Sequence, residues 1–354
     1  MKKICIVVGA RPNFVKVAPL MRAISKADGA TCSLVFAGCE DDPTLEPSLF
    51  EDLQMPRPDF YLGVDSQRLN EITSRVMAEF DRWLDEYPTD VVVVVDDLAS
   101  TMAAAIVTKK RGLKLAHLVA GTRSFDITMP KEINRLVIDA LSDYLFTAGV
   151  RSNSVATREQ SEASQTFMVG NILMDTLRHN LPRLKQPAIE GVDLSQTPYL
   201  VLTLNRRALL DDQAQLKAML DVVVGSGLDI VAPLRGEARR IVGALCGDAP
   251  NLHLTDALPY LEFGWLTAHA MGVITDSGNV AEEATFNQVP CITLNSYTEH
   301  QETVSVGTNV LVGGNQEALS QAVAQLTAHE WKPGALPERW DGRTAERIVQ
   351  ILLG

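Results

Sequence analysis

Long apolar runs are missing from this sequence of 354 residues. Nowhere do about 18 consecutive apolar residues occur, so we expect no membrane-spanning helix. The N-terminal run Ile4–Val8 is too short for a signal peptide, and Gly, Arg and Pro follow it at once. A basic surface is missing too, since 44 acidic and 32 basic residues leave a formal net charge of −12. This balance excludes nucleic acid as an expected partner, because phosphate contacts need clustered Lys and Arg.

Cysteine is scarce, and its spacing matches neither a zinc site nor a disulfide framework. There is no CxxC and no Cys/His pattern among the five cysteines, Cys5, Cys32, Cys39, Cys246 and Cys291. Most of them stand in apolar, strand-like surroundings. We therefore expect reduced core cysteines, a cytoplasmic protein, and no metal ion or redox cofactor.

Short β-branched runs alternate with helical periodicity along almost the whole chain. Apolar strands between helices are typical of parallel sheets covered on both faces. Strands are expected at 4–8, 91–95, 115–118, 144–147, 167–169, 199–204, 228–233, 252–254, 272–275 and 290–294. Helices are expected at 14–27, 69–86, 99–111, 131–142, 171–184, 211–224, 236–245, 259–270, 279–287, 316–327 and 343–353.

The pattern predicts two domains joined by one linker. Residues 1–185 form an N-terminal Rossmann-like domain, 186–198 a polar linker, and 199–340 a C-terminal nucleotide-binding Rossmann-like domain. The last helix, in residues 341–354, is expected to pack back on the first domain. The fold class is therefore α/β, with two doubly wound domains facing across a cleft that holds the ligand.

The first candidate site is the turn Gly9–Asn13 with Lys16 in the helix behind it. It fits neither a dinucleotide fingerprint nor a P-loop. Arg11 and Lys16 lie near a helix N-terminus, where a phosphate is well placed, or they are solvated cations on a tight turn.

The second candidate is the acidic pair Asp96-Asp97, directly after the strand 91–95. Asp97 is favoured for acid/base chemistry or hydroxyl binding, because it stands at the carboxyl end of a strand. The alternative is an N-cap for the helix that begins near Ala99.

The third candidate is the stretch from His117 to the start of the helix at 131–142. Glu132 and Arg135 are expected near the helix N-terminus, although Lys131 and Arg135 could also form a solvated helix face. His117 is expected to be a packed strand-end histidine rather than a base.

The fourth candidate is Thr275–Glu283, a strand that enters a Ser-Gly turn and a helix with two acids. Ser277 and the helix N-terminus suit a diphosphate, and a carboxylate one turn further can bind both ribose hydroxyls. Simple helix capping is the alternative.

These motifs resemble the non-hydrolysing UDP-N-acetylglucosamine 2-epimerase family from the first strand to the last helix. The order is GARPNFVKVAPL, VDDLASTMAAA, HLVAGTRS, MPKEINRLVIDALSDYLF, VGNILMDTL, LTLNRRA, YLEFGWLTAHAMGVITDSGNVAEEA, TEHQETVSVGTNVLVG and DGRTAERIVQIL. The resemblance implies a glycosyltransferase-B-like fold, a homodimer, and UDP held mainly by the second domain. It also implies interconversion of UDP-N-acetylglucosamine and UDP-N-acetylmannosamine, or of a related UDP-N-acetylhexosamine pair, by elimination and re-addition of UDP with no cofactor.

Carried over residue by residue, the resemblance implies two sets of site residues. The catalytic set is Asp97, Glu132, Lys16 and Lys131. The substrate-binding set is Arg11, Arg135, Asn205, Phe263, Ser277, Gly278, Asn279, Glu283 and His300.

Several family positions differ here. Family acids are replaced by Asn13, Val119, Lys131 and Ala208, the family His by Asn205, a glycine by Asn279 and an Arg by His300. The changes to Val119 and Lys131 alone add three positive units to the pocket. Three hypotheses follow: a 2-epimerase with a changed acid/base set, a transferase or hydrolase that cleaves the anomeric bond without epimerising C2, or a non-catalytic UDP-sugar-binding homologue.

Overall fold

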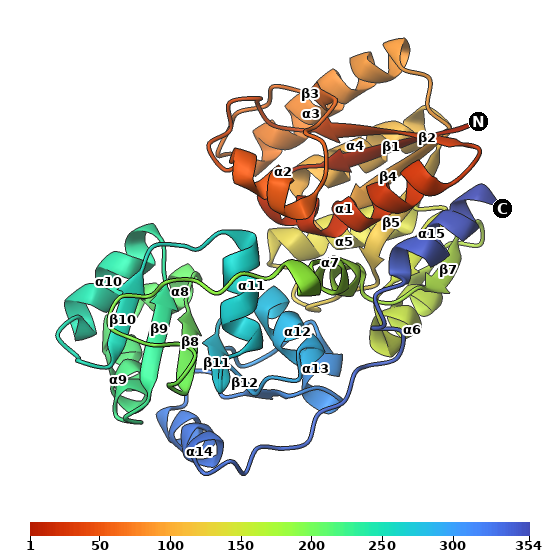
Figure 1. Cartoon of the computed structure of the whole chain (residues 1–354). Helices are drawn as coiled ribbons and strands as arrows, with labels where there is room; N and C mark the ends of the chain where they lie inside the picture. Colours follow the sequence, from red (N-terminus) through yellow and green to blue (C-terminus); the bar gives the residue numbers. More distant parts are fainter. The chain divides into compact units, whose positions relative to one another are not determined.

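The computed structural model describes all 354 residues, which form two compact units. Unit 1 comprises Met1–His179 and Glu338–Gly354, and unit 2 comprises Asn180–Pro337. Each unit has a parallel sheet with helices along its faces (Figure 1). None of the helices combines the length and apolar character that a membrane span requires.

Unit 1 is built on a seven-stranded sheet in the order β3-β2-β1-β4-β5-β6-β7. Its strands are β1 (Lys2–Val8), β2 (Ala30–Phe36), β3 (Phe60–Tyr61), β4 (Val91–Val95), β5 (Lys114–Ala120), β6 (Tyr144–Thr147) and β7 (Gln165–Met168). Its helices are α1 (Arg11–Lys26), α2 (Pro47–Leu53), α3 (Leu69–Glu86), α4 (Ala99–Lys110), α5 (Pro130–Leu141), α6 (Val150–Glu159), α7 (Ile172–Asn180) and α15 (Thr344–Leu353).

The helices of unit 1 cover the sheet on both sides because the strand order reverses at β1. The chain runs one way from β1 to β2 and the other way from β4 to β6, so right-handed crossovers place α1 and α4 on opposite faces. α3, α4 and α5 contact one another in series, and α1 contacts α15. The all-valine strand β4 is buried on both faces, as the absence of alternation predicted.

Unit 2 repeats the plan with a six-stranded sheet in the order β10-β9-β8-β11-β12-β13. Its strands are β8 (Tyr199–Thr203), β9 (Asp229–Pro233), β10 (Leu252–Thr255), β11 (Gly272–Thr275), β12 (Cys291–Thr293) and β13 (Asn309–Leu311). Its helices are α8 (Arg207–Asp211), α9 (Gln213–Val224), α10 (Gly236–Cys246), α11 (Tyr260–Ala268), α12 (Gly278–Phe286), α13 (Gln301–Ser305) and α14 (Gln316–Thr327). The predicted fold class, two doubly wound α/β halves, is confirmed.

The C-terminal helix α15 packs on unit 1, where a buried acid of α7 caps it. The carboxylate of Asp175 accepts hydrogen bonds from the backbone N–H groups of Thr344 and Ala345, at 3.0 and 2.8 Å. These two hydrogen bonds satisfy N–H groups at the N-terminus of α15 that would otherwise be buried without partners. Residues 186–198 contain no helix or strand, and Ile189 and Leu194 pack into the core of unit 2.

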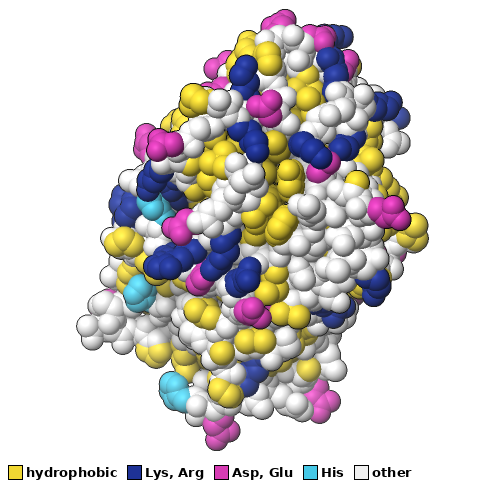
Figure 2. Space-filling view, turned by 90° about the vertical axis from the view of Figure 1, so that its right-hand side faces the viewer, with side chains coloured by type: hydrophobic (Ala, Val, Ile, Leu, Met, Phe, Trp, Pro, Cys, Tyr) yellow, Lys and Arg dark blue, Asp and Glu magenta, His cyan; other side chains and the backbone are white.

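The side of unit 1 that carries α15 and β7 faces the viewer in Figure 2, where Lys and Arg side chains border an area of apolar side chains. β7 is an edge strand, whose carbonyl groups could pair with another chain. Arg339 donates to the Met168 carbonyl, and Arg347 donates to the Val169 carbonyl at 2.9 Å. Arg339 and Arg347 therefore cover the C-terminal end of the edge strand β7.

Candidate functional site

The site in unit 1 lies where β1 and β4 end, at the point where the strand order reverses. Such a switch point leaves a crevice outside the carboxyl ends of the strands, which is the usual ligand site of this fold class. The Gly9–Asn13 turn follows β1, and the acidic pair Asp96-Asp97 follows β4. Two of the four predicted site segments are thus adjacent in space.

Asp96 joins the end of β4 to α1. Its carboxylate accepts from Lys16 Nζ at 2.6 Å and from Asn13 Nδ2 at 2.9 Å. Its backbone is left-handed, with φ of 59°, a conformation that Asp adopts more readily than most residues. Asn13 also accepts from the N–H groups of Gly9 and Ala10. An acid at position 13, as the resemblance implies for the family, could not donate to Asp96.

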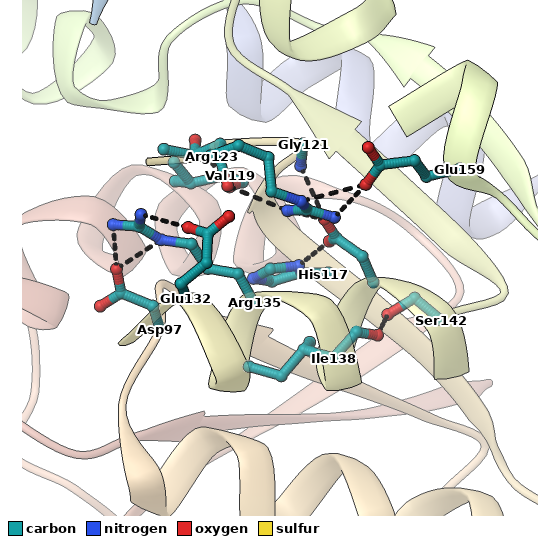
Figure 3. A network of polar contacts seen from close by, with 12 residues as sticks. Asp97, His117, Val119, Gly121, Arg123, Glu132, Arg135, Ile138, Ser142 and Glu159 are labelled. Atoms are coloured by element: carbon teal, nitrogen blue, oxygen red, sulfur yellow. Dashed lines mark hydrogen bonds and ion pairs between the residues drawn. The ribbon is translucent and has the colours of Figure 1, made fainter. Parts of the chain in front are cut away.

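Asp97 faces the N-terminus of α5 (Figure 3). Its Oδ2 accepts from Arg135 Nε at 2.8 Å and Nη2 at 2.5 Å, and its Oδ1 lies 3.5 Å from Lys131 Nζ. Burial by itself would raise the pKa of Asp97, but Lys131 and Arg135 outweigh it and hold the pKa below its ordinary value. Asp97 is therefore a carboxylate at neutral pH.

Neither acid of the pair caps α4, so the capping alternative is wrong. The N-cap residue is Leu98, whose side chain makes no capping hydrogen bond. Thr101 Oγ1 instead accepts from the Leu98 N–H at 3.1 Å. Both acids remain available for charged partners.

Glu132 is buried and holds a loop. Its carboxylate accepts from the N–H and hydroxyl of Ser124 at 2.8 and 2.9 Å, from the Phe125 N–H, and from Arg135 Nη1 at 3.2 Å. Burial raises the pKa of Glu132, while these donors lower it more, so its net direction is downward. With its oxygens occupied in this way, Glu132 positions Arg135 and the Ser124 turn.

A second network lies beside the first, at the end of β5 (Figure 3). His117 Nδ1 lies 2.5 Å from Asp139 Oδ1, and Arg123 Nη1 lies 2.7 Å from Asp139 Oδ2. Arg123 also pairs with Glu159 at 3.0 Å. Val119 stands in the same segment at φ of 74°, which is a strained conformation for a β-branched residue. His117 is packed, as predicted.

Arg11 begins α1, and Glu46 lies 3.9 Å from its Nη2. Its side chain is 28% exposed, unlike that of Lys16, which is buried against Asp96. Arg11 therefore presents its guanidinium at the start of the helix, where an anion is stabilised.

The site in unit 2 lies at the corresponding switch point, where β8 and β11 end. Asp276 Oδ2 accepts from the N–H groups of Asn205 and Arg206, both at 2.7 Å, and so fixes the turn after β8 to the turn after β11. Ser277 is the N-cap of α12, and Gly278 and Asn279 form its first turn. A Cβ at Gly278 would come within 2.8 Å of the His300 ring, so this close approach needs glycine.

Two acids follow in α12, and both are buried. Glu282 Oε1 lies 2.8 Å from His300 Nδ1. Burial, together with the charge of Glu282, raises the pKa of Glu283 to about 8. Phe263 is half-buried on α11, the helix that contacts α12.

The structure therefore groups the predicted residues by unit. Unit 1 brings together Lys16, Asp97, Lys131, Glu132 and Arg135, and unit 2 brings together Asn205, Ser277, Gly278, Asn279, Glu283 and His300. Sequence reasoning missed Asp96, Asp139 and Asp276 as organisers of the turns. For Asp96 and Asp276, the position directly after a predicted strand was the signal in the sequence, whereas Asp139 lies on a helix. No group of three or more His, Cys, Asp and Glu side chains could hold a metal ion.

Comparisons with known proteins agree on one family. Residues 22–353 match the model of the family described as UDP-N-acetylglucosamine 2-epimerase. A protein of Methanocaldococcus jannaschii named UDP-N-acetylglucosamine 2-epimerase is 32% identical, over 99% of this chain and 98% of its own. A UDP-2,3-diacetamido-2,3-dideoxy-D-glucuronate 2-epimerase of Pseudomonas aeruginosa is 31% identical, over 90% of this chain and 91% of its own. The crystal structure of the M. jannaschii UDP-GlcNAc 2-epimerase in complex with UDP-GlcNAc and UDP superposes with a TM-score of 0.84, at 32% identity and 99% coverage of both chains.

Proposed function

The chain belongs to the UDP-N-acetylglucosamine 2-epimerase family, and from this premise we propose that it is an isomerase of UDP-sugars. Its substrates are UDP-N-acetylglucosamine and UDP-N-acetylmannosamine, or a related UDP-N-acetylhexosamine pair. The observation that carries the proposal is the Asp97 carboxylate, held ionised between Arg135 and Lys131 just after the carboxyl end of β4. This is the state that a base for a carbon-bound proton requires.

The reaction proceeds through elimination and re-addition. The C2 proton leaves to a base while the C1–O bond to UDP breaks, which gives a glycal and UDP. UDP then adds back to C1, and C2 receives a proton on its opposite face. Asp97 is the proposed base, Lys131 is the proposed catalytic cation beside it, and Lys16 supports Asp97 through Asp96.

Unit 2 carries the proposed UDP-binding groups. The N-terminal turn of α12, from Ser277 to Asn279, offers N–H groups to the diphosphate. Glu283, one turn further, is the proposed partner of the ribose hydroxyls, and Phe263 is proposed beside the uracil. His300 and Asn205 border the same turn. Arg11 and Arg135 are the proposed substrate-binding cations of unit 1.

A second candidate function follows from Val119 and Lys131. Neither residue is a carboxylic acid, and the Glu132 carboxylate already accepts from Ser124, Phe125 and Arg135, which leaves Asp97 as the proposed base. An enzyme with one such carboxylate can break the anomeric C–O bond without exchanging the C2 proton. It would then be a glycosyltransferase or a hydrolase of UDP-sugars, and the third hypothesis, a UDP-sugar-binding homologue without turnover, remains an outcome of the same test.

Proton NMR of the protein with UDP-N-acetylglucosamine in heavy water tests the proposal. A UDP-N-acetylmannosamine signal with deuterium at C2 is the expected result. Asp97→Asn should abolish it, and Asp81→Asn, which alters an exposed ion pair on α3, should not. UDP release without deuterium at C2 would favour hydrolysis or transfer, and an unchanged spectrum with UDP bound would favour the binding role.

We also propose a homodimer in the cytoplasm. Four large apolar side chains are exposed on α5 and the loop before it: Phe125 is 60% exposed, Ile127 70%, Ile133 46% and Leu136 39%. Contiguous exposed apolar side chains mark protein interfaces. Sedimentation should report a dimer that Leu136→Glu weakens and Leu69→Glu, at an exposed position of α3, does not.

The five free cysteines suit the reducing compartment that we propose for the protein, the cytoplasm.

A further inference from the structure

His117 connects two parts of unit 1 that the sequence does not link. Its side chain is 1% exposed. Nδ1 lies 2.5 Å from Asp139 Oδ1 on α5, and Nε2 lies 2.9 Å from the backbone carbonyl oxygen of Asp96. The imidazole therefore bridges helix α5 and the turn that carries Asp97.

The partners of His117 determine which atoms carry its protons. A backbone carbonyl can only accept, so Nε2 is a donor. The second oxygen of Asp139 accepts from the Gly121 N–H at 3.0 Å and lies 2.7 Å from Arg123 Nη1. These donors stabilise the ionised form of Asp139, which holds the ring on its Nδ1 side.

The Asp96 carbonyl is a consequential acceptor because it belongs to the peptide bond that leads into Asp97. Asp96 adopts φ of 59°, and its N–H donates to the Leu118 carbonyl at 3.2 Å. The peptide on one side of Asp96 is thus bonded to β5 by Leu118, and the peptide on the other side is bonded to β5 by His117. On the far side of Asp97, its own carbonyl accepts from Asn134 Nδ2 at 2.8 Å.

We propose that His117 is a positioning residue, which bridges α5 and the Asp96 carbonyl, fixes the Asp96–Asp97 peptide and so aims the Asp97 carboxylate. This inference rests on the proposed function for the role of Asp97 in the reaction. The hydrogen bonds that carry it are independent of that function. A shift of about 1 Å in a reacting group costs about 100-fold in rate, so loss of the Nε2 bond should be visible in turnover.

Two substitutions separate the two bonds of the ring. The amide nitrogen of His117→Asn reaches the place of Nδ1 and keeps the Asp139 bond, whereas that of His117→Gln reaches the place of Nε2 and keeps the Asp96 bond. Because His117→Gln removes a partner of a buried carboxylate, it should be the less stable variant. Its kcat should nevertheless stay within about 10-fold of the wild type, while that of His117→Asn falls about 100-fold. UDP affinity should be unchanged in both.

This inversion between stability and turnover distinguishes positioning from a merely structural role. If turnover followed stability, with His117→Asn the more active variant, the proposal would be overturned. His253→Asn in unit 2, which breaks a 2.7 Å contact with Asp229, is the matched control and should leave kcat unchanged.

Nitrogen NMR provides a readout that needs no turnover. The Asp97 amide signal should move more in His117→Asn than in His117→Gln. The reverse order of amide shifts would overturn the proposal. If the wild type converts no UDP-N-acetylhexosamine, the proposed function fails, and these signals still decide whether His117 fixes the Asp97 peptide.

Discussion

Replacing Glu283 with Gln should remove most of the pH dependence of unit 2. The Glu283 carboxyl is buried in α12 next to Glu282, and burial raises its pKa from 4.5 to about 8. The carboxyl is therefore neutral in the folded protein at pH 6, whereas it is ionised in the unfolded chain. Gln has nearly the same shape and cannot ionise.

The sign and size follow from proton linkage. A group whose pKa is raised by folding contributes stability that is fully present below pH 4.5 and is lost as the pH rises toward 8. Each pH unit in that interval costs about 1.4 kcal/mol. Unit 2 should therefore lose about 2 kcal/mol of stability between pH 6 and pH 8, and little more above pH 8, where the folded form ionises too.

Hydrogen exchange of the ligand-free chain, with peptides from β11, α12 and β12, measures this change. The opening free energy, corrected for intrinsic exchange, should fall by about 2 kcal/mol from pH 6 to pH 8 in the wild type and by less than about 0.5 kcal/mol in Glu283→Gln. Glu317→Gln, at an exposed position in the first turn of α14, should behave as the wild type. A wild type whose protection does not fall over this interval would refute the reasoning.

Three further predictions concern unit 1. Lys16→Met leaves the Asp96 carboxylate with Asn13 and should lower the free energy of unfolding by about 3 kcal/mol in urea denaturation. The control is Lys114→Met, because the Lys114 side chain is 58% exposed and its partner Asp143 keeps Lys109; it should cost less than about 1 kcal/mol. Equal losses in the two variants would contradict this account. Burial raises the pKa of Asp139, but His117 and Arg123 lower it more, so unit 1 should lose stability as the pH falls below about 4; hydrogen exchange of β5 at pH 3 and pH 5 checks this, and Asp139→Asn should flatten the difference. Asp97→Asn should lower turnover at least about 100-fold and leave the Kd of UDP within about twofold in calorimetry, and a matching loss of UDP binding would assign Asp97 a different role.

Local sequence pattern determined most of the fold. The strands Val91–Val95 and Tyr144–Thr147 and the helices Leu69–Glu86 and Gln316–Thr327 have the predicted bounds, because apolar spacing within one element does not depend on distant contacts. The prediction missed β2, β3 and β13, together with α2, α6, α8 and α13. β3 has two residues and pairs only with β2, so its hydrogen bonds to a neighbour, rather than its own side chains, define it.

The sequence by itself also determined the family and the positions of the acids and cations, because motif order and residue type are properties of the chain alone. Only the tertiary structure decided which acidic side chain pairs with which basic side chain. Asp96 takes Lys16 and Asp97 takes Arg135 because β1, β4 and β5 lie side by side in one register, which brings residues 80 and 38 positions apart into contact. The same register turns Glu132 from a free acid into the anchor of the Ser124 turn and places His117 against the Asp96 carbonyl. A carboxylate can serve as a base, a counter-ion or an anchor, and its neighbours in space determine which of these roles it has.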